Sequence, residues 1–195
     1  MRFSGRHVGL VPLGEEHVEG LALAAAEDRS TYGLTWVPDG AEEATRYVDL
    51  ARRQRAAGRR IPFAVLDPVG RVVGSTSYFP EHHAWDVHTG PPDAVEIGAT
   101  WYAASVQRTA LNSEAKLLLL IHAFEGWRVS RVFLKTDALN TRSRQAIERL
   151  GARFEGVLRS HMPAYGRPGL RDTAYYSILP SEWPGVRAAL EARLG

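Results

Sequence analysis

The alternation of apolar and polar positions along the chain predicts a succession of strands and helices. A period of two residues predicts strands at 7–13, 61–67, 71–79, 94–103, 131–137, 153–162 and 171–179. Helix-forming composition predicts helices at 15–28, 41–58, 112–125, 141–151 and near the C-terminus. The order begins as an antiparallel meander and changes to strand, helix, strand. We therefore expect an α+β (mixed α/β) fold in a single domain over residues 1–195, with a central mixed sheet of about seven strands flanked by helices.

Composition narrows the function classes that this fold could serve. The chain has no cysteine, which excludes disulfides, thiolate zinc sites and a cysteine nucleophile. No stretch is apolar enough for a membrane span and the N-terminus does not resemble a secretory signal, so we expect a cytoplasmic protein without a membrane partner. The net charge is +2 with both signs interspersed, so no nucleic acid is expected. Only two of the 24 lysines and arginines are lysines, Lys116 and Lys135.

Residues 107–120, QRTALNSEAKLLLL, run from a polar turn into an apolar helix. Because the turn follows a predicted strand, free backbone N–H groups and the positive dipole end of the helix meet at one point, which is typical of an anion site. A diphosphate would also need side chains such as Gln107, Arg108, Thr109 and Ser113. The glycine patterns of a P-loop or a dinucleotide-binding fold are missing, so nucleoside triphosphates and NAD are not indicated. The alternative is a capped core helix with a polar turn.

Two motifs in the right order resemble the GNAT N-acetyltransferase superfamily. Gln107 stands at the first position of its diphosphate-binding signature, with Ala110 and Asn112 where glycines are usual. NTRSRQAIERLGARFEGVLR, residues 140–159, resembles the family's Asn-x-x-Ser helix and the strand that follows, most like the RimJ/RimL-type protein N-terminal acetyltransferases. The resemblance implies a GNAT-like twisted sheet that is splayed between its fourth and fifth strands. It also implies acetyl-CoA as cosubstrate.

The resemblance assigns donor-binding residues to the fourth strand, the polar turn and the start of the fourth helix. The pantetheine arm would pair with the strand, and the diphosphate would lie on the turn. The implied cofactor-binding residues are Ala99, Thr100, Trp101, Gln107, Arg108, Thr109, Ala110, Leu111, Asn112, Ser113, Asn140, Ser143 and Arg144. Asn112 tolerates left-handed backbone and can cap the helix, so we expect the altered turn to function. For two of these residues there is an alternative to a cofactor-binding role. The Trp101 ring could simply pack in the core, and Arg144 could be a solvated surface arginine.

Proton removal from an amine with a pKa near ~10 calls for a general base. Glu96 is a charged residue in an apolar strand, where alternation gives it one face with Gly98, Thr100 and Tyr102. Burial would raise the pKa of Glu96 toward the range useful for a base. Family members carry a catalytic glutamate on this strand, so the resemblance also favours Glu96. The alternative is an exposed glutamate on the wet face of the strand.

The remaining catalytic assignments concern the leaving group and a metal. The resemblance implies that Ser143 donates a hydrogen bond to the departing sulfur. The alternative is that Ser143 is only a helix-start residue bonded to Asn140. Ile147 stands where many relatives carry a tyrosine acid, so a tyrosine mechanism is not expected. No metal is required. A histidine-rich loop lacks clear metal-ligand spacing and is expected to be solvated or to line the acceptor groove; it holds Glu81, His82, His83, Asp86 and His88.

The acceptor is the least constrained part of the prediction. Tyr32, Trp36 and His161 are candidate substrate-binding residues, with ordinary packing as the alternative for each. The RimJ/RimL resemblance implies a primary amine at a protein or peptide N-terminus, with a small-molecule amine as the second expectation. The resemblance also implies a homodimer that forms through the late strands or the terminal helix. Succinyl-CoA is an alternative acyl donor. The rival classes are a non-catalytic acyl-CoA-binding domain and a structural protein that shares the fold.

Overall fold

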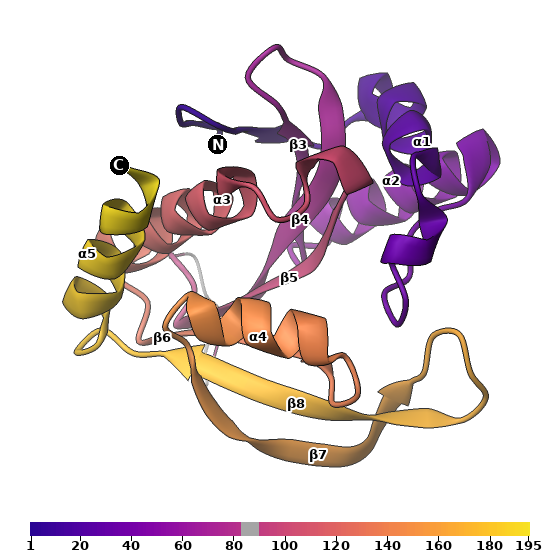
Figure 1. The fold of residues 1–195 in the computed structure, drawn as a ribbon. Helices are drawn as coiled ribbons and strands as arrows, with labels where there is room; N and C mark the ends of the chain where they lie inside the picture. Colours follow the sequence, from indigo (N-terminus) through magenta and orange to yellow (C-terminus); the bar gives the residue numbers. More distant parts are fainter. Residues whose placement is uncertain (83–89) are drawn as a thin grey trace.

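The computed structural model describes residues 1–82 and 90–195, and a mixed sheet forms its centre (Figure 1). The strands are β1 (Phe3–Ser4), β2 (Gly9–Pro12), β3 (Ile61–Leu66), β4 (Val72–Glu81), β5 (Ala94–Tyr102), β6 (Arg131–Asp137), β7 (Arg153–Pro163) and β8 (Leu170–Ile178). Their order across the sheet is β1-β2-β3-β4-β5-β6-β8-β7. Each predicted strand is present, and β1, two residues long, is an eighth. The expected mixed α and β fold class is confirmed.

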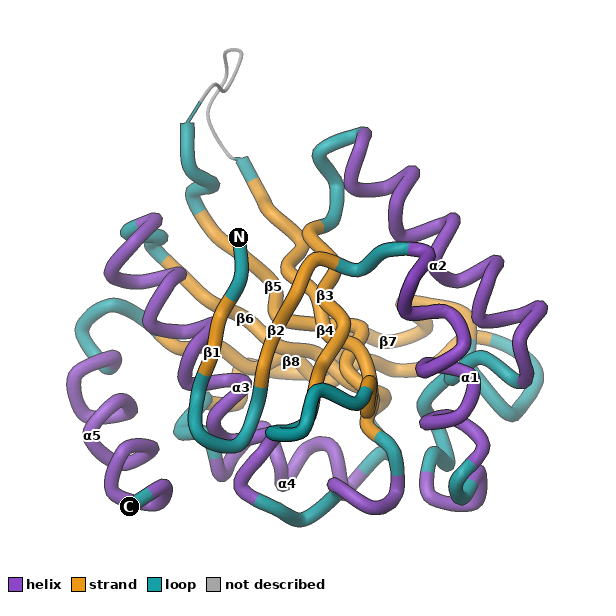
Figure 2. Tube along the Cα trace, turned by 90° about the horizontal axis from the view of Figure 1, so that it is seen from above, coloured by secondary structure: helices purple, strands orange, loops and turns teal. Residues whose placement is uncertain are grey.

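Helices cover both faces of this sheet (Figure 2). They are α1 (Val18–Ala26), α2 (Gly40–Ala56), α3 (Ala110–Ile121), α4 (Thr141–Arg149) and α5 (Trp183–Leu194). Tyr47 of α2 donates to Ser75 of β4 at 2.9 Å, whereas Tyr78 of β4 donates to the Leu119 carbonyl of α3. Because Ser75 and Tyr78 are an odd number of residues apart, α2 and α3 lie on opposite faces. Of the described helices, none has the length and apolar content to cross a bilayer.

The neighbouring strands β5 and β6 run parallel and separate soon after they begin. Residues 94–96 pair with residues 131–133, whereas β5 continues to Tyr102 and β6 to Asp137. On its other edge, β5 stays paired with β4 as far as Tyr102. The predicted splay between the fourth and fifth strands, here β5 and β6, is therefore confirmed. Within the described sheet, the β5 segment 97–102 has one edge without a strand partner.

A β-bulge interrupts β5 beside the splay. Thr76 of β4 faces two residues of β5, Ala99 and Thr100, and Ala99 takes a left-handed φ of +47°. The extra residue inverts the side-chain alternation, so the Thr100 side chain points toward α3 and its hydroxyl lies 2.7 Å from that of Thr76. The expectation that Thr100 and Tyr102 share a face with Glu96 is therefore wrong, because strict alternation ends at the bulge.

Polar side chains set the starts of α3 and α4. Thr109 Oγ1 accepts the Leu111 N–H at 3.3 Å and caps α3, and Asn140 Oδ1 accepts the Ser143 N–H at 3.0 Å and caps α4. The helix α3 begins at Ala110, two residues before the expected start near Asn112, and the expectation that Asn112 caps it is wrong. Thr109 provides a side-chain oxygen one residue before the first helical residue, so Asn112 lies inside the first turn.

Candidate active site

Glu96 lies at the point where β5 and β6 separate. It is the last β5 residue that pairs with β6, and it is only 7% exposed, so the alternative of an exposed glutamate is wrong. Its Oε2 lies 2.7 Å from Lys135 Nζ on β6. A Cβ added to Gly98 would lie 2.3 Å from Glu96 Oε1, so the carboxylate folds over a residue whose missing side chain leaves room for it. The carboxylate is thus held between β6 and the bulge.

The surroundings of Glu96 suit a proton acceptor. Burial is the largest influence and raises the pKa of Glu96, while the charge and hydrogen bond of Lys135 lower it in part, and the net pKa is raised. A carboxylate with a raised pKa is a stronger base while it remains ionised. Lys135 helps to keep it ionised by supplying the opposite charge. Lys135 therefore offsets part of the cost of burying a negative charge, while the net effect still makes Glu96 more basic.

The residues after Gly98 present backbone to the gap between the strands. Ala99 is exposed at the bulge, whereas the Thr100 side chain is turned toward α3. Trp101 is buried, and its ring lies edge-on to that of Tyr32 with the centroids 6.2 Å apart. The Trp101 ring therefore belongs to the core. The free backbone edge of this segment can accept an extended ligand as an added strand.

The start of α3 is open and rich in donors. Arg108 has a left-handed φ of +63°, and both Arg108 and Thr109 are exposed. The described structure gives no acceptor for the N–H groups of Arg108, Thr109 and Ala110, and residues at a helix start cannot bond within the helix. Asn112 and Ser113, in the first turn, are half-buried. Unpaired amides at the positive end of a helix dipole form a site for an anion such as a phosphate.

Gln107 joins this turn to two other parts of the chain. Its Nε2 donates to the Tyr102 carbonyl at 2.9 Å and to Thr31 Oγ1 at 3.1 Å, and its Oε1 accepts from Arg142 in the first turn of α4. Arg142 also donates to the Thr31 carbonyl at 2.9 Å. Arg142 is not among the site residues predicted from the sequence. Three arginines lie between 142 and 149, and nothing in their spacing shows which one reaches the α3 turn.

Three further predicted residues, Asn140, Ser143 and Arg144, lie at the start of α4. Asn140 uses Oδ1 for the helix cap, and its Nδ2 donates to Thr35 Oγ1 at 3.4 Å. The Ser143 N–H is the capped group, while its hydroxyl has no hydrogen-bond partner among the described residues. Arg144 Nε donates to the Tyr176 hydroxyl at 2.8 Å, so its guanidinium lies against β8. The structure therefore brings Asn140 and Ser143 together and directs Arg144 toward β8.

Two of the acceptor candidates, Tyr32 and Trp36, lie in the segment between α1 and α2. Tyr32 is buried, its hydroxyl donates to the Ala24 carbonyl at 3.2 Å, and burial raises its pKa to about 12. Trp36 is 44% exposed, and its ring lies 5.7 Å from that of Tyr47. Tyr32 is therefore part of the core beside Trp101, whereas Trp36 offers an aromatic surface to a ligand.

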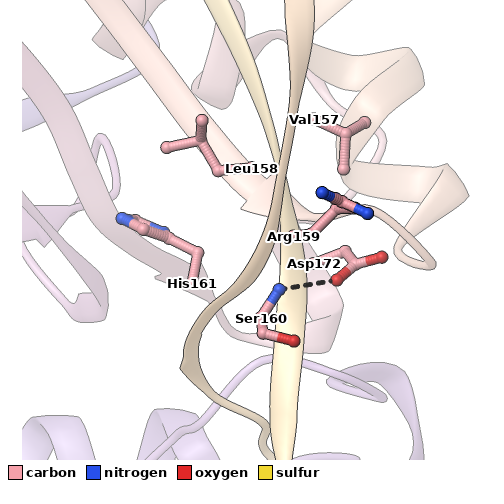
Figure 3. Close-up of a pocket in the computed structure, with 6 residues that line it drawn as sticks. All are labelled: Val157, Leu158, Arg159, Ser160, His161 and Asp172. Carbon is pink, nitrogen blue, oxygen red and sulfur yellow. Dashed lines mark hydrogen bonds between the residues drawn. The ribbon is translucent and has the colours of Figure 1, made fainter.

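The third acceptor candidate, His161, lies on the exposed strand β7. Its ring meets that of Tyr175 edge-on at 5.7 Å, and Lys135 Nζ lies 5.9 Å from the same Tyr175 ring. His161 also borders a shallow hollow of about 990 Å³, in which the Ser160 N–H donates to Asp172 at 2.8 Å (Figure 3). The hollow is lined by Val157, Leu158, Arg159, Ser160, His161 and Asp172. His161 is thus linked to Glu96 through Tyr175 and Lys135, but the hollow itself does not reach Glu96.

Metal ligands do not gather in the part of the chain that the structure describes. No three His, Asp or Glu side chains lie close enough there to hold an ion. Of the histidine-rich loop, His83, Asp86 and His88 lie outside the described residues. The expectation that no metal is required therefore stays a prediction.

Comparison with known proteins identifies a family and several relatives. A family model described as an acetyltransferase (GNAT) domain matches residues 7–153. YdaF of Bacillus subtilis, a candidate ribosomal N-acetyltransferase, is 33% identical over 92 residues, and the match spans 47% of this chain and 49% of YdaF, about half the length of each. A GCN5-related N-acetyltransferase from Brucella melitensis has a TM-score of 0.83 at 32% identity and covers 100% of this chain and 86% of its own. RimJ of Mycobacterium smegmatis in complex with CoA-disulfide has the same fold, with a TM-score of 0.77 at 22% identity over 95% of this chain and 88% of its own.

Proposed function

The chain belongs to the GNAT acetyltransferase family, and on that basis we propose that it transfers an acetyl group from acetyl-CoA to a primary amine at a protein or peptide N-terminus. The partial match to YdaF supports this acceptor class, as does the sequence of residues 140–159. The observation that carries the proposal is the buried Glu96 carboxylate at the point where β5 and β6 separate, next to a free backbone edge.

The donor half of the site fits a thioester on a long arm that ends in a diphosphate. The amides of residues 108–110 bind the diphosphate, and the dipole of α3 favours its negative charge. The backbone of residues 99–101 pairs with the pantetheine arm along the edge that β6 leaves free. Asn140, the residue before α4, bonds the arm with the N–H of its side-chain amide that the cap does not use. Arg142, which already contacts the α3 turn, is better placed than Arg144 to meet a phosphate.

The acid–base chemistry centres on Glu96. Its carboxylate accepts a proton from the acceptor ammonium group, directly or through water, and the neutral amine then attacks the thioester carbonyl carbon. The C–S bond breaks as the tetrahedral intermediate collapses, and the leaving thiolate takes up the proton that the attacking nitrogen releases as it becomes the amide. A thiol with a pKa near ~8.5 is a fair leaving group, so a hydrogen bond from Ser143 is sufficient assistance.

A non-catalytic acyl-CoA-binding domain is the rival proposal. It is favoured by Ala110 and Asn112 in place of glycines, and by Ile147, which is buried where a tyrosine acid would stand. Under this rival the α3 turn still binds CoA, but no acceptor is acetylated. The buried base argues against it, because a domain that only binds CoA has no use for a desolvated carboxylate beside the thioester.

Thiol release from acetyl-CoA separates these proposals. The wild-type protein is mixed with acetyl-CoA and a panel of N-terminal peptides and small amines, and CoA binding is measured in parallel by calorimetry. We expect turnover with peptides above that with small amines. CoA binding without turnover in any acceptor, and without an effect of Glu96→Gln, would favour the rival, and no affinity for CoA would overturn both.

We also expect the enzyme to act in the cytoplasm as a homodimer. Acetylation of ribosomal proteins, the role that the name of YdaF indicates, would place the reaction there. The edge strand β7 supports the dimer, since Val157 and Leu158 are exposed on it. Light scattering of the purified protein tests the dimer, and a mass equal to one chain would contradict it.

A further inference from the structure

A buried ammonium group on α3 has no role in the chemistry given above. Lys116 is 4% exposed, and its Nζ donates to Thr100 Oγ1 at 2.7 Å and to Thr76 Oγ1 at 3.2 Å. Both acceptors are neutral hydroxyls, and in the described part of the chain no carboxylate is ion-paired with Lys116. Burial of a charge without a counter-ion is costly to stability. A side chain at this position is therefore expected to have a use that offsets the cost.

The position of Lys116 points to that use. Thr100 and Thr76 are two of the residues that form the β5 bulge, so the ammonium lies directly behind it on the α3 face. Glu96 lies on the other face, and its charge still acts on Lys116. Lys116 is also two turns along the helix whose first amides face solvent. One side chain thus connects the helix with the open edge of β5.

We propose that Lys116 is a positioning residue for acetyl transfer, which fixes the β5 bulge through Thr100 and places a positive charge behind the backbone edge that holds the thioester. This rests on the proposed function. The oxyanion of the tetrahedral intermediate and the departing thiolate are both negative, and a preorganised cation in a dry site stabilises such charge. Lys116 touches neither, and it acts through Thr100 and the backbone of the bulge.

The charge on Lys116 depends on groups from three strands. Thr76 on β4 and Thr100 on β5 contact it, and Glu96 on β5, itself paired with Lys135 on β6, acts on it from the far face. Burial lowers the pKa of Lys116 to about 7, and Glu96 opposes part of this change. The ammonium is therefore lost as the pH rises through about 7. Activity that needs this charge should fall on the alkaline side, where amine deprotonation would otherwise raise it.

Lys116→Met tests the proposal because it keeps the length of the side chain and removes its charge. With acetyl-CoA and the best peptide acceptor, we expect kcat to fall by about tenfold to a hundredfold, less than the loss of a direct oxyanion donor. The alkaline limb near neutral pH should disappear. The Tm should stay equal or rise, since an unpaired buried charge is removed. Lys116→Arg keeps the charge and should move the alkaline limb to higher pH.

Other results would overturn the proposal. The control is Leu118→Met on the same helix, and a kcat for Lys116→Met within about twofold of it would overturn the proposal. A lowered Tm with an unchanged alkaline limb would also overturn it, because that result is expected of a lysine with a purely structural role. If Lys116→Met does not fold, Thr100→Val is measured instead; it removes the contact with the bulge but keeps the ammonium group, so kcat should fall while the alkaline limb stays, and a kcat within about twofold of Leu118→Met would overturn the proposal. A wild-type protein that releases no thiol with any acceptor refutes the proposed function and this inference together, whereas an active wild type with an unaffected Lys116→Met refutes this inference alone.

Discussion

The two lysines of the chain lie on opposite faces of the sheet and have different partners. On the α2 face, Lys135 lies 2.7 Å from the carboxylate of Glu96. On the α3 face, Lys116 contacts only the hydroxyls of Thr76 and Thr100 among the described residues. Lys135 opposes part of the effect of burial on the pKa of Glu96, whereas burial lowers the pKa of Lys116 to about 7. The bulge causes this difference, because it turns Thr100 to one face and leaves Glu96 on the other.

Glu96→Gln should have the largest effect on activity, because it removes the base from the α2 face and leaves Lys135 without a partner. We expect kcat to fall by roughly 10²- to 10⁴-fold, the usual contribution of general base catalysis. The measurement is kcat with acetyl-CoA and a peptide acceptor over a pH series. Glu182→Gln is the matched control, since Glu182 is ion-paired with Arg153 at 2.7 Å outside the site. Equal rates for the two variants would exclude Glu96 as the base.

Gly98→Ala should have the next largest effect, because it moves the carboxylate without removing it. The new Cβ would lie 2.3 Å from Glu96 Oε1, and the end of that flexible side chain must give way. A shift of about 1 Å in a reacting group can lower kcat by ~10²-fold, while the fold should be kept because alanine suits an extended strand. Gly185→Ala on α5, where a Cβ meets no atom within 4 Å, is the control. An unchanged kcat would show that the position of the carboxylate is not critical.

Lys135→Met should shift the pH dependence of both activity and stability. Without Lys135, the effect of burial on Glu96 is opposed less and the pKa of Glu96 rises further, so the acidic limb of kcat moves to higher pH. A carboxyl with a raised folded-state pKa stabilises the fold below its unfolded pKa, and this contribution is lost as the pH rises through the folded value. The variant should therefore lose stability relative to the wild type on going from acidic to neutral pH. We expect a loss of about 2 kcal/mol, less than for a fully buried pair because the Lys135 side chain is 22% exposed.

Thermal unfolding at several pH values, together with the kcat profile, checks this prediction. Lys135→Arg keeps the positive charge and serves as the control, with both profiles close to those of the wild type. An acidic limb that stays in place in Lys135→Met would mean that Lys135 does not act on the base. A limb that moves to lower pH would contradict the direction of the electrostatic argument.

Much of the fold was predictable because long segments with a regular apolar period form the same strand or helix in the folded protein. The seven predicted strands and the Asn140 start of α4 follow from periodicity and capping chemistry. The two-residue β1 is too short to show a period. The bulge at Ala99 inserts a single residue and has no hydrophobic signature, so strict alternation assigned Thr100 to the wrong face. The contact between Lys116 and Thr100 depends on that bulge and could not be predicted without it.

The candidate active site could also be predicted only in part from the sequence. Glu96 was recognisable as a charged residue in an apolar strand, and its burial is confirmed. Lys135 was not recognised as its partner, because Lys135 lies on another strand and the two meet only through the register of β5 and β6. Sequence separation hides such pairs. Arg142 was missed for a related reason, because helical spacing alone does not fix which residue of a first turn faces a neighbouring loop.

The smallest effect is expected at the α3 turn, where the donor end of the site departs from the usual glycines. Ala110→Gly and Asn112→Gly remove side chains beside amides that face solvent, while Thr109 keeps the cap. We expect the KM for acetyl-CoA to fall by about twofold to fivefold at unchanged kcat, because the backbone can approach a diphosphate more closely, at a cost of roughly 0.5–1 kcal/mol in helix stability. Ala146→Gly in α4 is the control. It has the same cost in helix stability but lies outside the α3 turn, so the KM for acetyl-CoA should not change. If the KM stays constant in all three variants, the diphosphate does not lie against the first turn of α3, and the free edge of β5 alone would have to position the thioester.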